Sequence, residues 1–534
     1  MSSNDVLFYD VVIIGAGPGG ISSAYHLKKH CPQKTFIILD KFSGIGGTWF
    51  QNTYPGVRSD ASIWAFSFYW HQYPLNSKYI TGGDLLDYFK EACYHNDLTP
   101  FFKFNKTVTR LKFDSTTNIW EIYILNEDGK LEQINCRFIM SNMGYINHEK
   151  PHIPVFNQQQ QFHGEIVHSQ KFPKDMDLKN KNVLVIGSGA TSISMVPELA
   201  KTANVTLLQR SPSWLHTRNN STILFKILEL LFCSKKVANV VMRVYELVTW
   251  FLVHHVLSLM WPLNRILMFY MKKRIALKYP NLDMKHFTPK YKLWEQRPCL
   301  MIDDDLLKLV DKKHVTIHTD TISHFHKDGV FLVSGKFVAT DVVILATGFE
   351  LFENFFHGNV EIYIDDKKFH ICDEINYNGY MITNLPNLTW ANGSFILPAI
   401  PFLDMIAHRA SKLISEMSKH NYDKCYIKPN PNMFTIDGYT FRNFVLQSNS
   451  PNYLKRWIDK FPRGIPKFGI YPKWGLLQGS WFYIFEYLHS SFNKDHWVFY
   501  SKGEIKIHKK KYNKRVTIFA LVFLMIFCLR AKLF

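Results

Sequence analysis

The sequence lacks the paired cysteines that mark several protein classes. Its eight cysteines include no Cys-x-x-Cys pair, which argues against a zinc ribbon or a redox dithiol. They also give no disulfide framework, so we expect a reducing compartment. The sequence predicts no metal site.

Acidic residues are scarce relative to basic ones. The 534 residues include 44 Asp and Glu against 63 Lys and Arg, a formal net charge of +19. Such a surplus is typical of proteins that bind nucleic acid, an anionic membrane surface or an anionic cofactor. Seven basic residues lie within 502–515, and the others form no basic stripe in the sequence. We therefore expect no nucleic-acid partner, and a non-enzymatic basic protein is the alternative that rests on charge alone.

The C-terminal apolar run is short for a membrane span. Val516–Leu529 has 14 uncharged residues, and extension to Phe534 gives 19, against the roughly 20 that cross a bilayer. Arg530 and Lys532 can snorkel near its end. With the basic residues before it, the segment predicts a membrane-associated protein whose C-terminal tail is the anchor and whose catalytic domains face the cytoplasm. A packed C-terminal helix is the alternative.

Other apolar and terminal features do not suggest further spans. The stretch Val244–Trp261 contains Glu246 and two histidines, which favours a cap over a substrate site, with membrane contact by its outer face left open. Met1–Asp10 is largely polar and predicts no cleavable signal peptide. The hydrophobic fraction of 47% and the chain length indicate a globular protein of two to four domains.

A strand, a glycine turn and a helix open the chain. The strand Asp10–Ile14 precedes a predicted helix over Ile21–Lys29, and between them lies Gly15-Ala16-Gly17-Pro18-Gly19-Gly20. In a dinucleotide-binding turn the first glycine permits the bend, the second lets the backbone approach the pyrophosphate, and the last lets helix pack on strand. A second strand, Thr35–Leu39, ends at Asp40, where a carboxylate can accept hydrogen bonds from ribose hydroxyls. A glycine-rich turn without a ligand is the alternative.

The same arrangement occurs a second time. The strand Asn182–Ile186 leads into Gly187-Ser188-Gly189-Ala190-Thr191-Ser192, with a small residue in place of the last glycine. The next strand, Asn204–Leu208, is followed by Gln209-Arg210-Ser211 rather than by an acid. Because an arginine pairs with a 2′-phosphate and a carboxylate repels it, this site is predicted to bind NADP. A solvated surface charge is the alternative for Arg210.

Two such units predict a flavoprotein with FAD in the first site and NADPH in the second. The flavin would carry the redox chemistry, and the protein would orient and protect it. Disulfide reductases share this layout, but they need the cysteine pair that the chain lacks.

Further motifs resemble the class B flavoprotein monooxygenases, and among them the Baeyer–Villiger type and its ethionamide-activating subgroup. Phe162-x-Gly164-x3-His168-x3-Phe172-Pro173 is similar to the family fingerprint and lies between the two nucleotide units, as in that family. Other segments resemble the flavin-side segment, the A-T-G strand and the subgroup's own motifs: Gly44-x-Gly46-Gly47-Thr48-Trp49, Tyr54-Pro55-Gly56-Val57-Arg58-Ser59-Asp60, Leu345–Phe349, His286–Pro289 and Trp294–Arg297. The resemblance covers roughly residues 8–450.

The resemblance implies an activity. In that family NADPH reduces FAD, O2 adds to give a C4a-peroxyflavin, and one oxygen atom enters a small apolar ketone to give an ester or lactone. Related flavin-containing monooxygenases act instead on nitrogen or sulfur. Phe172 stands where many Baeyer–Villiger enzymes have Trp, so oxygenation of amines or thioethers is the alternative activity.

The resemblance also assigns roles to residues. Arg297 matches the arginine that stabilises the transition state, with a structural ion pair as the alternative, and Asp60 matches the acid that orients it. The other positions are expected to contact a cofactor: Gly47, Thr48, Trp49, Arg58, Ser59 and Val108 on the FAD side, and Ser188–Ser192 with Arg210 and Ser211 on the NADP side. For Val108, a backbone contact to the adenine, an ordinary strand valine is the alternative. His168 would couple the domains.

The predicted fold is α/β with two Rossmann-like domains. The expected limits are 1–150 and 341–500 for a discontinuous FAD domain, 151–340 for the NADP domain with a helical insertion at about 220–300, and 501–534 for the tail. Residues Leu351–His370 match the family poorly, and we expect them to line a different substrate space.

Overall fold

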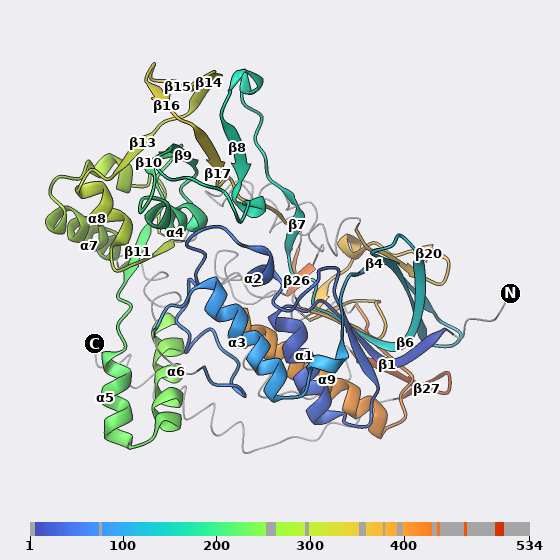
Figure 1. The fold of residues 1–534 in the computed structure, drawn as a ribbon. Helices are drawn as coiled ribbons and strands as arrows, with labels where there is room; N and C mark the ends of the chain where they lie inside the picture. Colours follow the sequence, from blue (N-terminus) through green and yellow to red (C-terminus); the bar gives the residue numbers. More distant parts are fainter. Residues whose placement is uncertain are drawn as a thin grey trace.

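The computed structural model contains two α/β lobes (Figure 1). It describes residues 6–73, 77–251, 263–293, 298–351, 359–377, 380–391, 399–429, 435–437, 464–466 and 497–506. The lobe with β1, β4 and β6 lies to the lower right in Figure 1, and the lobe with β9, β10 and β17 to the upper left. Each lobe is built on its own sheet.

The first sheet has nine strands in the order β20-β19-β4-β5-β6-β1-β2-β3, with β23 also paired to β6. Its parallel centre is formed by β1 (Leu7–Ile14), β2 (Phe36–Leu39), β3 (Phe102–Lys103) and β6 (Leu131–Ser141). The strands β4 (Lys106–Asp114) and β5 (Ile119–Asn126) add an antiparallel hairpin beside β6. The last four residues of β1 and all of β2 are buried, which explains their continuous apolar sequence.

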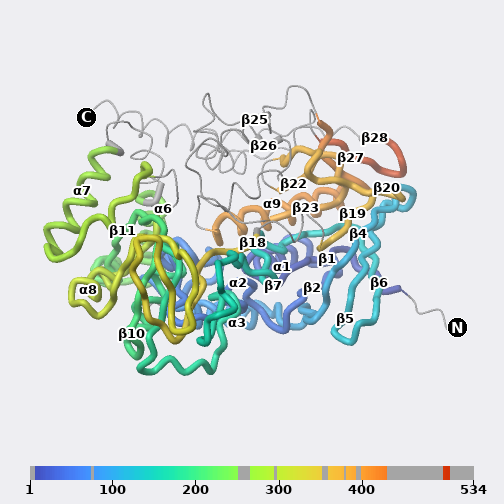
Figure 2. Tube along the Cα trace, turned by 90° about the horizontal axis from the view of Figure 1, so that it is seen from above, coloured from blue at the N-terminus to red at the C-terminus, as the bar shows by residue number. Residues whose placement is uncertain are grey.

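The first sheet also takes strands from far along the chain. β19 (Glu361–Ile364) pairs with β4, and β23 (Leu388–Trp390) pairs with β6. Figure 2 shows these later segments beside the N-terminal strands. The predicted discontinuity of the FAD domain is therefore confirmed. The expectation that Leu351–His370 lines a substrate space is wrong for β19 and β20 (Lys367–Lys368), because they extend the edge of the sheet.

The second sheet is parallel, in the order β13-β10-β9-β17-β8. Its strands are β8 (Glu165–His168), β9 (Asn182–Ile186), β10 (Asn204–Gln209), β13 (Val315–Thr319) and β17 (Val342–Leu345). A separate antiparallel meander stands beside it, formed by β14 (Ile322–His326), β15 (Gly329–Leu332) and β16 (Phe337–Ala339).

The helices complete the two lobes. α1 (Pro18–His30), α2 (Thr48–Gln51), α3 (Gly82–His95) and α9 (Ala399–Lys419) belong to the first, and α4 (Ala190–Leu199) and α8 (Asp305–Asp311) to the second. The predicted helical insertion contains α5 (Ile223–Phe232), α6 (Lys235–Phe251) and α7 (Leu263–Lys278).

Short strands link and extend the lobes. They are β7 (Ile146–Pro151), β11 (Leu215–Arg218), β12 (Cys299–Ile302), β18 (Phe349–Leu351), β21 (Asn376–Tyr377), β22 (Met381–Ile382), β24 (Lys424–Ile427), β25 (Thr435–Asp437), β26 (Gly464–Pro466), β27 (Trp497–Ser501) and β28 (Glu504–Lys506). β7 pairs with β18. The first of these two strands precedes the second sheet in the chain and the other follows it.

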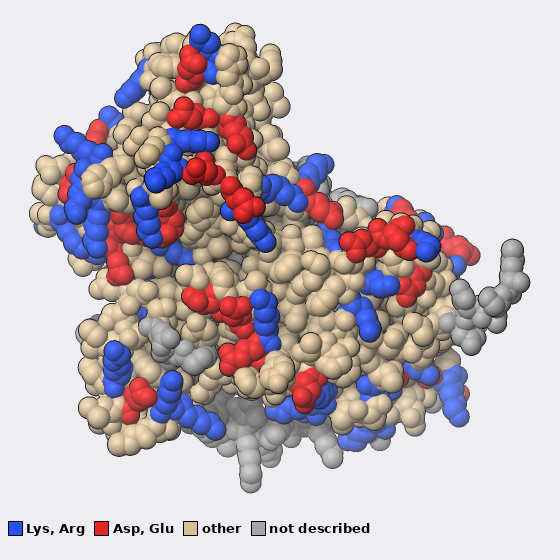
Figure 3. All heavy atoms as spheres, viewed as in Figure 1, with Lys and Arg blue, Asp and Glu red and all other residues tan. Residues whose placement is uncertain are grey.

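The predicted membrane anchor and the surface charge are tested only over the described residues. No helix in this part of the chain is long and apolar enough to cross a bilayer, and the predicted tail anchor, Val516–Phe534, lies outside the described residues. On the face drawn in Figure 3, basic and acidic side chains are interspersed.

Candidate active site

The first glycine turn joins β1 to α1. Gly15 adopts a φ of +107°, which L side chains rarely adopt, and its N–H donates to the carbonyl of Leu39 at 2.7 Å. A side chain at Gly20 would collide with the carbonyl oxygen of Gly15. α1 begins at Pro18 with Gly17 as a cap that has no side chain, so the N–H groups of its first turn stay available to an anion.

A second loop lies against this turn. A Cβ built on Gly17 would be 3.6 Å from the Cα of Gly47, an ordinary contact distance. Gly47 precedes α2, which contains Thr48 and Trp49. Thr48 Oγ1 lies 3.2 Å from His148 Nε2, and Trp49 packs against the core of the first lobe. The loop therefore faces the glycine turn with its backbone at Gly47. Such a backbone-lined approach fits a pyrophosphate bound beside the turn.

The Asp40 carboxylate stabilises the first glycine turn by accepting backbone hydrogen bonds. Its Oδ2 accepts from the N–H of Ala16 at 2.6 Å, and its Oδ1 from the N–H of Phe42 at 2.8 Å. Burial raises the pKa of the carboxyl, and the two backbone donors oppose that rise. Each oxygen keeps a further lone pair, so the predicted contact with ribose hydroxyls fits. Val108 is buried in β4, two residues after Lys106, whose N–H donates to the Asp40 carbonyl.

The second glycine turn joins β9 to α4. The N–H of Gly187 donates to the Leu208 carbonyl at 2.9 Å. Gly189 caps α4 and is exposed, and in the described part of the chain no atom lies within 4 Å of a Cβ placed on it. Ser192 is fully buried and donates from Oγ to the Gly189 carbonyl at 2.9 Å. The N-terminus of α4, at Gly189 and Ala190, is therefore open to solvent and accessible to a ligand.

The loop after β10 lies beside this turn. Ser188 Oγ donates to the Ser211 carbonyl at 2.8 Å and lies 3.1 Å from Ser213 Oγ. Arg210 and Ser211 are exposed. The glycine turn and the arginine are therefore close in space, as the prediction of an NADP site requires.

Replacing Arg210 by glutamine is expected to raise the KM for NADPH about 10–100-fold, the equivalent of one charge-assisted hydrogen-bond set of about 1.5–3 kcal/mol. The KM for NADH should change little, because NADH has no 2′-phosphate. Steady-state oxidation of both cofactors measures this. Lys179→Gln is the control. Lys179 is exposed and precedes the start of β9, whereas the glycine turn follows the end of that strand. An equal rise in the KM for NADH would contradict the assignment of Arg210 to the 2′-phosphate of NADPH.

The fingerprint motif brings the two lobes together. His168 ends β8 and is paired in register with Leu345 at the end of the A-T-G strand. Its Nδ1 accepts from the N–H of Gln170 at 3.1 Å, and Gln170 Nε2 donates to the Asn147 carbonyl in β7 at 2.6 Å. Phe172 is buried in the core of the second lobe, and its carbonyl accepts from Thr53 Oγ1 of the first at 3.4 Å. A coupling role for His168 agrees with these contacts.

The flavin-side segment 54–60 contacts the second lobe directly. A Cβ on Gly56 would collide with the Ser194 carbonyl of α4. Arg58 Nη1 donates to Asp305 Oδ2 at 2.6 Å, where α8 begins. Burial raises the pKa of Asp305, and the charge and hydrogen bond of Arg58 oppose that rise. Arg58 Nη2 is buried without a hydrogen-bond partner among the described residues, which fits an arginine that also donates to an anionic cofactor.

Asp60 lies at the exposed end of the same segment. Ser59 before it is fully buried, and its N–H donates to the Ile80 carbonyl at 3.0 Å. The Asp60 carboxylate contributes to the raised pKa of Tyr54 and of Tyr79, after burial as the larger cause. Arg297 lies outside the described residues, so its pairing with Asp60 stays a prediction.

Several residues at the site carried no recognisable sequence signal. Asn142 follows β6, donates from Nδ2 to Ser23 Oγ at 3.1 Å, and lies where a side chain on Gly19 would collide with it. His148 and Asp305 make the contacts described above. None belongs to a local motif, and their partners lie about 100 residues or more away in the chain.

The buried histidine His148 predicts acid sensitivity. Burial, aided by the charges of Lys41 and Lys171, lowers its pKa to about 3, against about 6.5 when unfolded. Between these values the unfolded chain binds more protons, so stability is lost as the pH falls below about 6.5. From pH 7 to pH 5 His148 should cost about 2 kcal/mol in the free energy of unfolding. Urea unfolding at both pH values measures this loss.

The matched variants separate this effect from general acid damage. His148→Gln should lose about 2 kcal/mol less than the parent protein over that pH range. His163→Gln, at an exposed position, should behave like the parent. If all three proteins lose the same stability, His148 is not held neutral by burial.

Residues 9–377 match the family described as flavin-binding monooxygenase-like. The chain belongs to this family. It is 32% identical to the probable FAD-binding monooxygenase AlmA of Acinetobacter sp., over 85% of this chain and 89% of that protein. It is 30% identical to the FAD-containing monooxygenase EthA of Mycobacterium tuberculosis, over 85% and 91% of the two chains.

Solved structures share the fold. The cyclohexanone monooxygenase of Rhodococcus sp. Phi1 bound to NADP+ is 20% identical with a TM-score of 0.68, and 90% of this chain and 98% of that one are covered. A steroid monooxygenase bound to NADP gives a TM-score of 0.65 at 20% identity, over 79% and 88% of the chains. The fold is thus that of known Baeyer–Villiger enzymes.

Membership of the family confirms three predictions. The chain is an NADPH-dependent flavin monooxygenase, its cofactors are FAD and NADPH, and O2 and an organic substrate are its reactants; solved structures that share its fold are bound to NADP, one of them with FAD as well. The two glycine turns, each with an uncapped helix N-terminus, fit the two dinucleotides. The contacts of single residues with those cofactors stay predictions.

Proposed function

We propose that the protein inserts one oxygen atom of O2 into a small apolar ketone to give an ester or lactone. The position of segment 54–60 carries this proposal. Gly56 packs on α4 and Arg58 pairs with α8, so Asp60 lies where the two lobes meet. The acid that the Baeyer–Villiger motif expects beside the reacting atoms would thus be near both cofactors.

The proposed chemistry divides between the cofactors and the chain. Bound FAD, reduced by NADPH, supplies the activation of O2. Arg58 would hold the lobes together and donate to a cofactor, and Asp60 would orient Arg297 toward the negative charge that develops during oxygen transfer. His168 ends a strand of the NADP lobe, and Phe172 after it accepts a hydrogen bond from Thr53 of the FAD lobe. The oxygenating flavin species that the family resemblance implies stays a prediction.

Product analysis tests the substrate class. The FAD-loaded protein is supplied with NADPH, O2 and equal amounts of a cyclic ketone and an aryl methyl thioether. The proposal predicts a lactone as the main product. A sulfoxide without lactone would replace the proposal with heteroatom oxygenation, the activity that Phe172 left open.

We also propose that the enzyme is attached to a membrane. The predicted anchor at residues 516–534 is one support, and the exposed face of α5 and α6 is another. Large apolar side chains there reach solvent: Ile223, Leu224, Ile227, Leu230, Leu231, Phe232, Val237, Val240, Val244 and Val248. Lys226, Lys235 and Lys236 are exposed on the same two helices. An apolar face flanked by lysines suits an anionic lipid surface.

Deletion of residues 507–534 is expected to move most of the protein from the vesicle-bound to the free fraction in a flotation assay with anionic vesicles. Further replacement of Leu230 and Leu231 by serine should release what remains bound. NADPH oxidation should persist in both variants, because neither touches a glycine turn. Full-length protein that does not float with the vesicles would contradict membrane attachment.

A further inference from the structure

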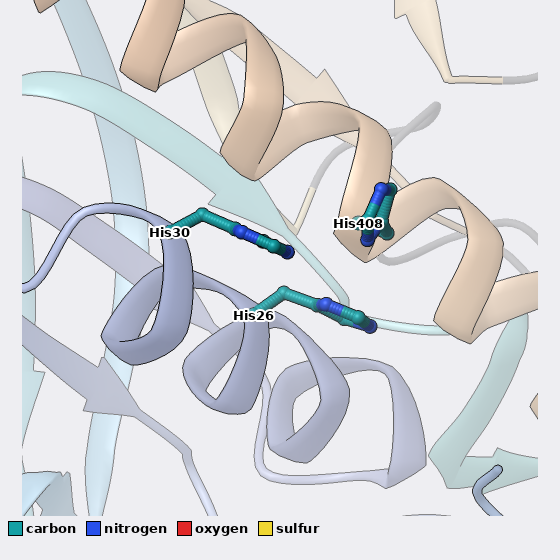
Figure 4. Close-up of side chains that lie close together, drawn as sticks. All are labelled: His26, His30 and His408. Atoms are coloured by element: carbon teal, nitrogen blue, oxygen red, sulfur yellow. The ribbon is translucent and has the colours of Figure 1, made fainter. Parts of the chain in front are cut away.

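Three histidines from two helices lie close together (Figure 4): two are on α1 and one is on α9. His26 and His30 lie one helical turn apart on α1, so their side chains share one face. His408 faces them from α9. One ring nitrogen of each histidine lies within 4.8 Å of the others. Neither the proposed reaction nor the coupling of the lobes uses these residues.

The three rings lie close together in two orientations. Those of His26 and His30 are nearly parallel, with an interplanar angle of 7° and centroids 5.7 Å apart. The His408 ring is perpendicular to both, with centroids 5.0 Å and 4.8 Å away. Bonds of about 2.0–2.1 Å to a tetrahedral ion place donor nitrogens about 3.3–3.4 Å apart. The three nitrogens, now within 4.8 Å of one another, would reach that spacing by rotation of the side chains when the ion binds.

The hydrogen bonding of His26 leaves a nitrogen ready to bind a metal. Its Nε2 lies 3.1 Å from Asp404 Oδ1, and a carboxylate only accepts, so Nε2 carries the proton. The lone pair is then on Nδ1, which is buried and has no hydrogen-bond partner in the described part of the chain. A histidine oriented by a carboxylate in this way is the usual form of a metal ligand.

His30 offers a comparable nitrogen. Its Nε2 is buried and has no hydrogen-bond partner among the residues that the structure describes. The ring of His408 lies across from both α1 histidines, with centroids 5.0 Å from that of His26 and 4.8 Å from that of His30.

We propose that His26, His30 and His408 form a binding site for one Zn²⁺ ion that joins α1 to α9. Three nitrogen donors suit Zn²⁺, with water as the fourth ligand. His30 and His408 are only half-buried, which gives the ion and its water a path from solvent. Since α1 begins at the FAD turn, the ion fixes the far end of the helix that faces the cofactor. The sequence shows only the spacing of His26 and His30, because His408 lies 378 positions after His30.

The test uses the full-length, FAD-loaded protein, stripped with a chelator and dialysed against buffered Zn²⁺. We expect one bound ion per chain and a rise in Tm on binding. His30→Gln and His408→Gln should each weaken binding at least ~100-fold, because they remove a direct ligand and a lost outer partner alone costs ~10–100-fold. FAD absorbance confirms that each variant is folded. With Co²⁺ as the probe, visible bands of a tetrahedral site should appear in the parent and be absent from both variants.

A second histidine group provides the control. His71, Glu91 and His95 also place donor atoms within 4.8 Å of one another, but His95 and Glu91 are exposed. His95→Gln should leave the bound ion and the Co²⁺ bands unchanged. A parent protein that retains no Zn²⁺ would overturn the proposal. Equal retention by the parent and His30→Gln, or loss of the ion in His95→Gln alone, would also overturn it.

Discussion

Gly17→Ala is expected to give a folded protein whose affinity for FAD is about 10–100-fold lower. Gly17 has a φ of −73°, which alanine adopts freely, and among the described residues the added methyl would meet only the backbone of Gly47, at ordinary distances of 3.6 Å to Cα and 4.0 Å to N. The protein alone should therefore tolerate the change. The methyl would occupy the space through which the backbone approaches the pyrophosphate, and overfilling such a contact costs about 1–3 kcal/mol.

Titration of the apoprotein with FAD measures the effect, and circular dichroism checks the fold. Gly83→Ala makes the same change in the first turn of α3, where the nearest atom to the new Cβ is Thr81 Oγ1 at 3.8 Å, and it should bind FAD normally. Gly20→Ala should instead disturb the fold, because its methyl collides with the Gly15 carbonyl. Normal FAD affinity in Gly17→Ala would show that the pyrophosphate lies elsewhere.

Gly189→Ala is the matching change in the second turn. We expect full FAD content and a KM for NADPH raised about 10–100-fold. The position is exposed, its φ of −81° suits alanine, and no atom of the described residues lies within 4 Å of the added carbon. The cofactor is therefore the group that such a methyl would displace.

Stopped-flow reduction of bound FAD by NADPH separates binding from hydride transfer. The limiting rate at saturating NADPH should stay close to that of the parent, and the concentration for half-maximal rate should rise. Loss of FAD in Gly189→Ala, or an unchanged NADPH dependence, would contradict the assignment of the two turns.

The two turns show what local sequence determines. Asn182–Ile186 was predicted with its observed bounds, and the observed limits of β1 and α1 exceed the predicted ones by only a few residues. Strand periodicity, glycines and helix onset all lie within about 30 residues, so local patterns suffice. Propensity does not reveal which distant segments pair.

The connections between the lobes illustrate that limit. The Arg58–Asp305 pair spans 247 positions, and neither side chain differs locally from a solvated surface charge. β19 contains a common strand sequence, and only its pairing with β4, a strand some 250 residues earlier in the chain, shows that it extends the first sheet. The contact of Asp404 with His26 spans 378 positions. Such contacts depend on the folded topology and could not be predicted from one sequence.

The proposed function, oxygenation of a ketone by an NADPH-dependent flavin monooxygenase, can be measured by turnover under ¹⁸O₂ with NADPH and a cyclic ketone, followed by mass spectrometry. This function predicts a lactone that carries one ¹⁸O atom and consumption of NADPH equal to the lactone formed. NADPH oxidation that yields only hydrogen peroxide with every ketone and thioether supplied, or a lactone without ¹⁸O, would contradict it.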